Sequence, residues 1–303
     1  MKKYNFDLTV NSSALLCPNP DEWFARAYLS EDTAKNYRVI PGVKSSTKVA
    51  NVSFQNILVA ETCDFTASAS VLSAVTMTVC PLQAQIQICK KDIESSFISL
   101  QMAKGSANWD VASFMNHYWE AAQAEINEEI ELIRWNGNTS TGSTFYGLCN
   151  GYDQILNADA RVIDLTATTV TVTNVIDELT KALLALPATV QSKKKDLRFY
   201  VASNVATAFT IAASKGNTIN YVTEALGFNF AGIEMIEAPG MASNRIVLTR
   251  KDNLVYLIDG MNDQSELKAV NLTETTAQPL IRTAAYLKIG FGILNPQEIV
   301  YVH

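Results

Sequence analysis

His117 and His303 are the only histidines in the chain, so few side chains could exchange protons near neutral pH. His117 lies between Asn116 and Tyr118 in a segment of helical periodicity, where a surface or groove histidine is the simplest interpretation. The sequence contains no H-x-x-x-H zinc motif, phosphate-binding loop, G-x-G-x-x-G dinucleotide fingerprint or G-x-S-x-G nucleophile elbow. We therefore expect no catalytic residues, no cofactor-binding residues and no metal site.

Two clusters of like charge are the remaining candidates for chemistry. Paired carboxylates can act in acid–base catalysis or hold a cation, and four glutamates lie close together at Glu125, Glu128, Glu129 and Glu131. No basic or histidine partner recurs at matching spacing, which favours a solvated helix face. Residues 193–195 are three lysines without interleaved aromatics, so they indicate a solvated turn.

The net charge of the chain is −6, which argues against a sequence-specific DNA-binding protein but allows a protein that merely encloses DNA.

The cysteines bear on the redox environment. They are odd in number, widely spaced and free of any C-x-x-C pair, at Cys17, Cys63, Cys80, Cys89 and Cys149. This arrangement favours reduced intracellular thiols and argues against a disulfide framework or a zinc ribbon. Asn5 and Asp7 interrupt the apolar core that a signal peptide would need, and no apolar run is long enough for a membrane helix. We expect neither export nor a membrane partner.

One long helix must organise the middle of the chain. Asn108 can cap its start, and Asn136-Gly137 supplies a pair that tolerates left-handed backbone and so stops it. At 1.5 Å per residue the helix would be roughly 40 Å long. Apolar side chains recur every three or four residues, which predicts a buried stripe of Val111, Met115, Tyr118, Ala122, Ile126, Ile130 and Ile133.

The stretch from Tyr37 to Cys80 is rich in Val, Thr, Ser and Ala and has few charges, which predicts a long β-hairpin. The hairpin could pack within its own chain, or it could be an arm that lies on a neighbouring subunit. In the second case the contacting residues would be Lys44, Lys48, Val49, Val52, Phe54, Ile57, Leu58 and Val59. The apolar phase switches across Pro81, which predicts a kink where the strand leaves one sheet and joins another.

The rest of the chain mixes helices and strands. Asn174 and Pro187 bracket a helix, a strand begins at Leu197, and a second helix begins at Asn204. From Ala231 onward the pattern predicts strands. The last is unusually long, and its apolar face is Ile281, Ala285, Leu287, Ile289, Phe291 and Ile293. The predicted fold class is α+β.

The order of these pieces resembles the major capsid proteins of tailed bacteriophages, which have the Hong Kong 97-type fold. A W-N-G…G-L pattern also follows the long helix, at Trp135, Asn136, Gly137, Gly147 and Leu148. The resemblance implies an N-terminal arm over residues 1–35, an E-loop hairpin over 36–80, a peripheral (P) domain with the spine helix over 81–150, an axial (A) domain over 151–261, long P-domain strands over 262–290, and a C-terminal strand over 291–303 that returns to the A domain.

The resemblance also implies a function without catalysis. Subunits would assemble as hexamers and pentamers into an icosahedral head around double-stranded DNA, which they would contact non-specifically. Portal and a separate scaffolding or decoration protein would be further partners. Because only about 35 residues precede the hairpin, the family's N-terminal scaffolding segment is missing, which implies a separate scaffolding protein or none. The chain would assemble in the host cytoplasm and end in the virion. Two alternatives remain open: the shell of an encapsulin-type nanocompartment, and a soluble cytoplasmic α/β enzyme or binding module.

Overall fold

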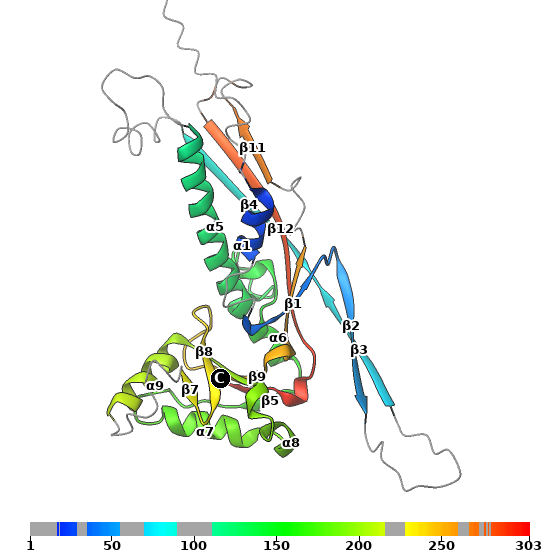
Figure 1. Ribbon diagram of the computed structural model, residues 1–303, viewed down its shortest axis with the longest axis vertical. Helices are drawn as coiled ribbons and strands as arrows, with labels where there is room; N and C mark the ends of the chain where they lie inside the picture. The colour runs from blue at the N-terminus through cyan, green and yellow to red at the C-terminus, as the bar shows by residue number, and fades with distance from the viewer. Residues whose placement is uncertain are drawn as a thin grey trace, which may run out of the picture. The chain divides into compact units, whose positions relative to one another are not determined.

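The computed structural model describes residues 17, 19–28, 35–54, 70–89, 111–215, 228–259, 267–272, 276, 278 and 280–303 (Figure 1). The chain divides into two compact units. The first comprises Met1–Glu31, Pro81–Ile130 and Asp259–Lys288, and the second comprises Asp32–Cys80, Glu131–Ile258 and Ile289–His303. Helix α5 (Val111–Asn136) and strand β12 (Leu280–Ile293) contribute residues to both units. Among the described residues, no helix has the length and apolarity needed to cross a membrane.

The first unit packs helices against strands. Its elements are α1 (Pro20–Tyr28), α5 as far as Ile130, β4 (Cys80–Cys89) from Pro81 onward, β11 (Leu267–Asn271) and the first part of β12. Strand β12 pairs with β4 and lies antiparallel to β11. Trp23 on α1 is buried and donates a 2.7 Å hydrogen bond to the backbone oxygen of Trp119 on α5. This bond satisfies a polar atom that would otherwise be costly to bury.

The second unit is built on a six-stranded sheet with the order β5-β13-β9-β6-β8-β7. These strands span Ile163–Leu165, Val300–Val302, Ile246–Arg250, Leu197–Val201, Ile233–Glu237 and Asn229–Phe230, respectively. Neighbouring helices are α6 (Tyr152–Ala158), α7 (Val175–Ala185), α8 (Ala188–Gln191) and α9 (Ser203–Lys215). Short 3-10 turns occur at Tyr146–Leu148, Lys194–Asp196, Lys251–Asn253 and Pro296–Glu298.

The predicted hairpin forms from β2 (Ser46–Phe54) and β3 (Ser70–Thr78), paired antiparallel from Ser46↔Thr78 to Phe54↔Ser70 (Figure 1). The chain enters it from β1 (Arg38–Pro41), which runs parallel to β10 (Leu254–Asp259). After β3 the strand breaks at Val79, and β4 joins a different sheet. The predicted change of sheet near Pro81 is therefore confirmed.

The long strand β12 confirms its predicted alternation. Ile281, Ala285, Leu287, Ile289, Phe291 and Ile293 are all buried, whereas Arg282 and Tyr286 are exposed. The predicted helix after Asn174 is also present, with Val175 and Leu179 fully buried. Asn174 is its N-cap residue, but its side chain makes no capping hydrogen bond to the helix; it accepts a 2.7 Å hydrogen bond from the Thr171 N–H, which precedes the helix.

The prediction of reduced thiols is wrong for one pair, because Cys80 and Cys149 form a disulfide. Their separation of 69 residues exceeds that of any local cysteine motif, so only the folded chain brings them together. Cys17 and Cys89 are free, and Cys63 lies outside the described residues.

Candidate assembly surface at the hairpin base

The base of the hairpin is anchored within its own chain. Val43, Val49 and Met77 are buried in one cluster with Val255 and Leu257 of β10. The Val43 N–H donates to the Ile258 oxygen at 3.2 Å, and the Val79 N–H donates to the Ser45 oxygen at 2.9 Å. The predicted role of Val49 in contacting a neighbouring subunit is therefore wrong, because its side chain is 8% exposed and already packs inside its own chain.

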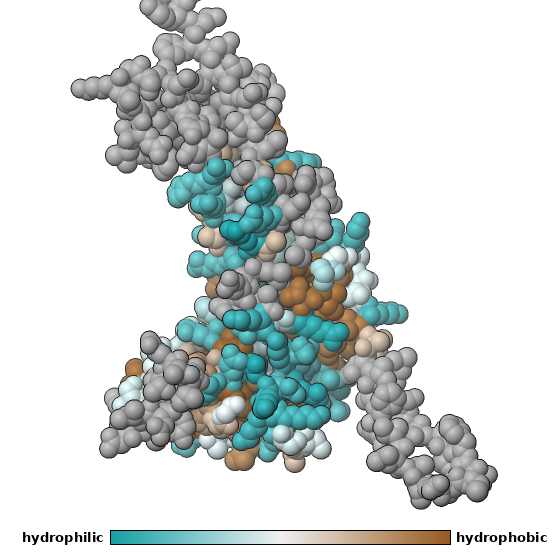
Figure 2. Space-filling model, viewed as in Figure 1, coloured by the Kyte–Doolittle hydropathy of each residue, from teal (hydrophilic) through white to brown (hydrophobic). Residues whose placement is uncertain are grey.

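The other residues predicted to contact a neighbour differ in how far the structure describes them. Lys44 and Lys48 are exposed. The backbones of Val52 and Phe54 lie in β2, opposite Leu72 and Ser70. Ile57, Leu58 and Val59 lie outside the described residues. Figure 2 shows apolar side chains gathered on the surface over β1 and the hairpin base, where Ile40, Val75, Val79 and Leu294 are partly buried.

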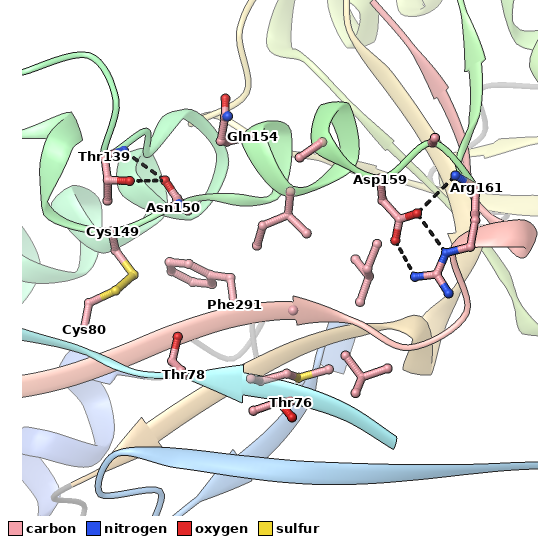
Figure 3. A pocket seen from close by; sticks show the side chains of 17 residues that line it. Thr76, Thr78, Cys80, Thr139, Cys149, Asn150, Gln154, Asp159, Arg161 and Phe291 are labelled. Atoms are coloured by element: carbon pink, nitrogen blue, oxygen red, sulfur yellow. Dashed lines mark hydrogen bonds and ion pairs between the residues drawn. A yellow bond between two sulfur atoms is a disulfide. The ribbon is translucent and has the colours of Figure 1, made fainter. Parts of the chain in front are cut away.

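A groove of about 770 Å³ lies beside the hairpin base (Figure 3). It is lined by β3, by the loop before α6, by α6 and the turn that follows it, and by β12 from Phe291 to Ile293. Strand β12 packs closely against β3 here. A Cβ on Gly292 would lie 2.5 Å from the Met77 sulfur, and a Cβ on Gly290 would lie 2.4 Å from the Thr78 oxygen. Only glycine allows β12 to approach β3 this closely.

The two ends of the groove are polar and its middle is apolar. Near the disulfide, the backbone N–H and the side chain of Thr139 both donate to Asn150 Oδ1 at 2.9 Å. At the other end the Arg161 side chain donates two hydrogen bonds to the Asp159 carboxylate, at 2.9 and 2.7 Å, and its backbone N–H donates a third at 3.0 Å; these bonds lower the pKa of Asp159 (Figure 3). Phe291 lies between these two polar ends. This lining suits contact with another polypeptide, because it combines apolar area with hydrogen-bonding groups.

A buried arginine at the end of α5 is a feature that the sequence analysis missed. Arg134 is 1% exposed, forms an ion pair with Glu131, and places its guanidinium carbon 4.8 Å from the Tyr37 ring centre and 4.9 Å from that of Tyr256. Tyr152 stacks on Tyr37, with ring centres 5.8 Å apart. No single sequence pattern could reveal this cluster, since its residues come from distant segments of the chain.

The W-N-G residues beside this cluster have structural roles. Trp135 is buried against Tyr152, and Asn136 donates a hydrogen bond to the Gly240 oxygen. Gly137 follows the last residue of α5, but its backbone is not left-handed as predicted. It is needed for close packing, because a Cβ there would lie 2.3 Å from the Cys149 oxygen.

The predicted stripe on α5 is largely buried. Met115, Ala122, Ile126, Ile130 and Ile133 are at most 7% exposed. Tyr118 is half-buried and shares a hydrogen bond with Thr283 Oγ1, and the side chain of Val111 is outside the described set.

On the opposite face of α5, four polar side chains are exposed, as a solvated face requires: His117, Glu125, Glu128 and Glu129. Partial burial and the charge of Glu125 raise the pKa of Glu129. Within the described residues, no cluster of His, Cys, Asp and Glu could hold a metal ion.

Several apolar side chains of the second unit are exposed outside the hairpin. Leu184 is 71% exposed and Ile176 is 47% exposed, two turns apart on the same side of α7. Ile211 on α9 is 38% exposed. Exposed apolar residues that share one helix face mark a candidate contact surface between subunits.

Comparisons with known proteins identify the fold. No protein-family model and no curated protein matches the chain. Among solved structures, a satellite phage P4 procapsid chain matches with a TM-score of 0.58 at 10% identity, covering 88% of this chain and 92% of its own. A capsid chain of an empty GTA particle matches at 0.57 and 12% identity, covering 91% and 89%. A virus-like particle from Pyrococcus furiosus matches at 0.53 and 13% identity, covering 96% and 97%.

Proposed function

We propose that this chain, which has the Hong Kong 97-type fold, is the major capsid protein of a tailed bacteriophage. Its copies would assemble as hexamers and pentamers into an icosahedral head that encloses double-stranded DNA. The observation that carries the proposal is the match to the P4 procapsid chain, which covers about nine tenths of both chains. At 10% identity the likeness concerns the fold, so the function is proposed by analogy of architecture, together with the candidate contact surfaces.

The parts of the chain fit distinct tasks in a shell. The first unit, with most of α5 as its spine helix, serves as the P domain. The six-stranded sheet with α7 and α9 serves as the A domain, which meets its copies around the capsomer axes. The hairpin β2–β3 serves as the E-loop: its base is anchored by Val43 and Met77, and the part beyond the Val49↔Val75 pair reaches the next subunit.

The energetics favour assembly through many modest contacts. At roughly 25 cal/mol per Å² of apolar area, a contact of about 400 Å² contributes roughly 10 kcal/mol before the entropy of association is subtracted. Closed symmetry repeats the same contact around the shell. With a net charge of −6 the chain has no strong attraction for DNA, so DNA contact would be non-specific. Portal and scaffolding or decoration proteins are proposed as further partners, with the virion as the final location.

One observation also supports a second function, the shell of a nanocompartment. The virus-like particle from Pyrococcus furiosus matches over 96% of this chain, so the same architecture is compatible with an encapsulin-type shell around protein cargo. The fold does not distinguish these two contents.

Electron microscopy of the purified full chain tests the proposal directly. We expect closed icosahedral shells with hexamers and pentamers. Particles purified from infected cells and treated with nuclease should retain long double-stranded DNA. Shells that hold only a protein cargo would support the encapsulin-type function. A monodisperse monomer in light scattering would contradict both.

A further inference from the structure

The disulfide between Cys80 and Cys149 lies at the base of the hairpin. Cys80 follows the break at Val79, where the chain passes from the hairpin into β4, and Cys149 lies in the loop between α5 and α6. The bridge therefore ties the hairpin base to the segment that follows the long helix.

Each cysteine's own segment is held in place by contacts that do not involve the bridge. On one side, Gly290 packs against Thr78 and Val79, and the Val79 N–H bonds to Ser45. On the other side, the Gly151 N–H donates to the Gly137 oxygen at 2.8 Å, and Gly137 packs against the Cys149 backbone. The Cα atoms are 5.8 Å apart, within the usual range for a disulfide, so the bridge can close without moving either segment far.

The two cysteine residues differ in exposure. Both residues line the open groove, but Cys80 is partly exposed whereas Cys149 is 2% exposed (Figure 3). A small reagent can reach Cys80 first, and Cys149 is then the nearest thiol to complete the exchange. This asymmetry favours closure within one chain over crosslinks between copies.

We propose that Cys80 and Cys149 form a redox-controlled lock on the hairpin base, open as dithiols while the chain assembles and closed by oxidation afterwards. The inference rests on the proposed function, in which assembly takes place in a reducing cytoplasm and the particle later leaves it. The locked base holds the E-loop in its assembled position, so oxidation stabilises a finished shell.

The chemistry is thiol–disulfide exchange with a small oxidised disulfide such as oxidised glutathione. The Cys80 thiolate attacks one sulfur of the oxidant, forms a mixed disulfide and releases one glutathione thiolate. The Cys149 thiolate then attacks Cys80 Sγ, closes the bridge and releases the second. The two protons lost by the cysteines end on the two glutathione thiols, so the protein is oxidised by two electrons and the oxidant is reduced by two.

Counting thiols tests the order of events. Cells are lysed directly into denaturant with N-ethylmaleimide, and the chain is weighed by mass spectrometry. We expect five alkyl groups per chain at lysis, and three after purified particles are incubated with oxidised glutathione, with Cys80 and Cys149 unlabelled. A chain that already carries only three at lysis would overturn the proposal.

Thermal melting tests the lock. Oxidised particles should melt about 5–10 °C above the same particles treated with a phosphine reductant. Cys80→Ser and Cys149→Ala should each assemble and lose this difference, whereas Cys89→Ser, at a free cysteine, should keep it. Equal melting of oxidised and reduced wild-type protein would overturn the lock without any variant. If no shells form in either state, the proposed function fails, and the thiol count and the melt of the unassembled chain still decide the lock.

Discussion

Arg134 shows how one side chain can connect several segments of the second unit. Its guanidinium lies between the rings of Tyr37 and Tyr256 and pairs with Glu131, so it joins the chain before β1, the end of α5 and strand β10. A buried cation keeps its charge at low cost only while such partners surround it.

Replacing Arg134 with Met should lower the free energy of unfolding by about 3 kcal/mol, because Glu131 loses its partner and the aromatic rings lose their cation. Urea titration followed by circular dichroism measures this change. Arg161→Met is the matched control: its pair with Asp159 is on the surface, with the arginine side chain 63% exposed, and its loss should cost under about 1 kcal/mol. Equal losses in the two variants would contradict the assigned role of Arg134.

The tyrosines of the second unit predict a loss of stability at alkaline pH. Burial raises the pKa of Tyr37, Tyr152, Tyr200 and Tyr256 above the ordinary value of 10.0. Above pH 10 the unfolded chain releases these protons while the folded chain keeps them, so stability is complete below pH 10 and falls as the pH rises. The slope approaches about 1.4 kcal/mol per pH unit for each tyrosine. Urea titrations from pH 8 to 11 measure it, and Tyr256→Phe should reduce the slope by up to about 1.4 kcal/mol per pH unit.

The buried and exposed faces of α5 predict which substitutions in this helix destabilise the protein. Ile126→Asp places an unpaired carboxylate at a position that is 6% exposed, which should cost several kcal/mol and give insoluble or misfolded protein. Glu128→Gln, on the exposed face of the same helix, should change the melting temperature by only a degree or two. A thermal melt that does not separate the two variants would show that the buried stripe is wrongly assigned.

Shortening the hairpin should block assembly without unfolding the chain. A short Gly/Ser turn that replaces residues 51–73, joined at the Ala50↔Ala74 pair, keeps the buried base of Val43, Val49 and Met77. We expect a folded chain with an almost unchanged melting temperature that forms no closed shells, since closing a short loop costs little.

The control deletion removes the anchored base as well. Replacing residues 41–70 takes Val43 and Val49 out of the cluster with Val255 and Leu257, and should destabilise the second unit by several kcal/mol. Normal shells from the shorter deletion would contradict the E-loop assignment.

Exposed apolar side chains predict which surfaces would meet in the proposed shell. Leu184→Lys changes a side chain that is 71% exposed, so the monomer should keep its stability while capsomer formation falls at least tenfold, because a charge would be buried at the contact. Size-exclusion chromatography with light scattering measures the assembled fraction. Lys181→Ala on the same helix should assemble normally. If Leu184→Lys also assembles normally, this face of α7 does not contact another subunit.

Local sequence patterns were enough to predict several elements of this protein. A repeat of three and four residues is enough to predict the buried face of α5, and strict alternation is enough to predict that of β12. These patterns by themselves predicted an α+β fold. The Hong Kong 97-type fold was implied by the resemblance of the element order to that of tailed-phage major capsid proteins.

Contacts between distant residues could not be predicted from such patterns. The disulfide joins residues 69 positions apart, and Val49 is buried because β10, some two hundred residues later, lies against the hairpin base. Arg134 is enclosed by tyrosines from separate segments, and Gly137 is required by the Cys149 backbone. Local periodicity reports which face of an element is apolar, but not the partner that covers it. That partner is set when the chain closes on itself and every buried group must find a neighbour of matching shape and charge.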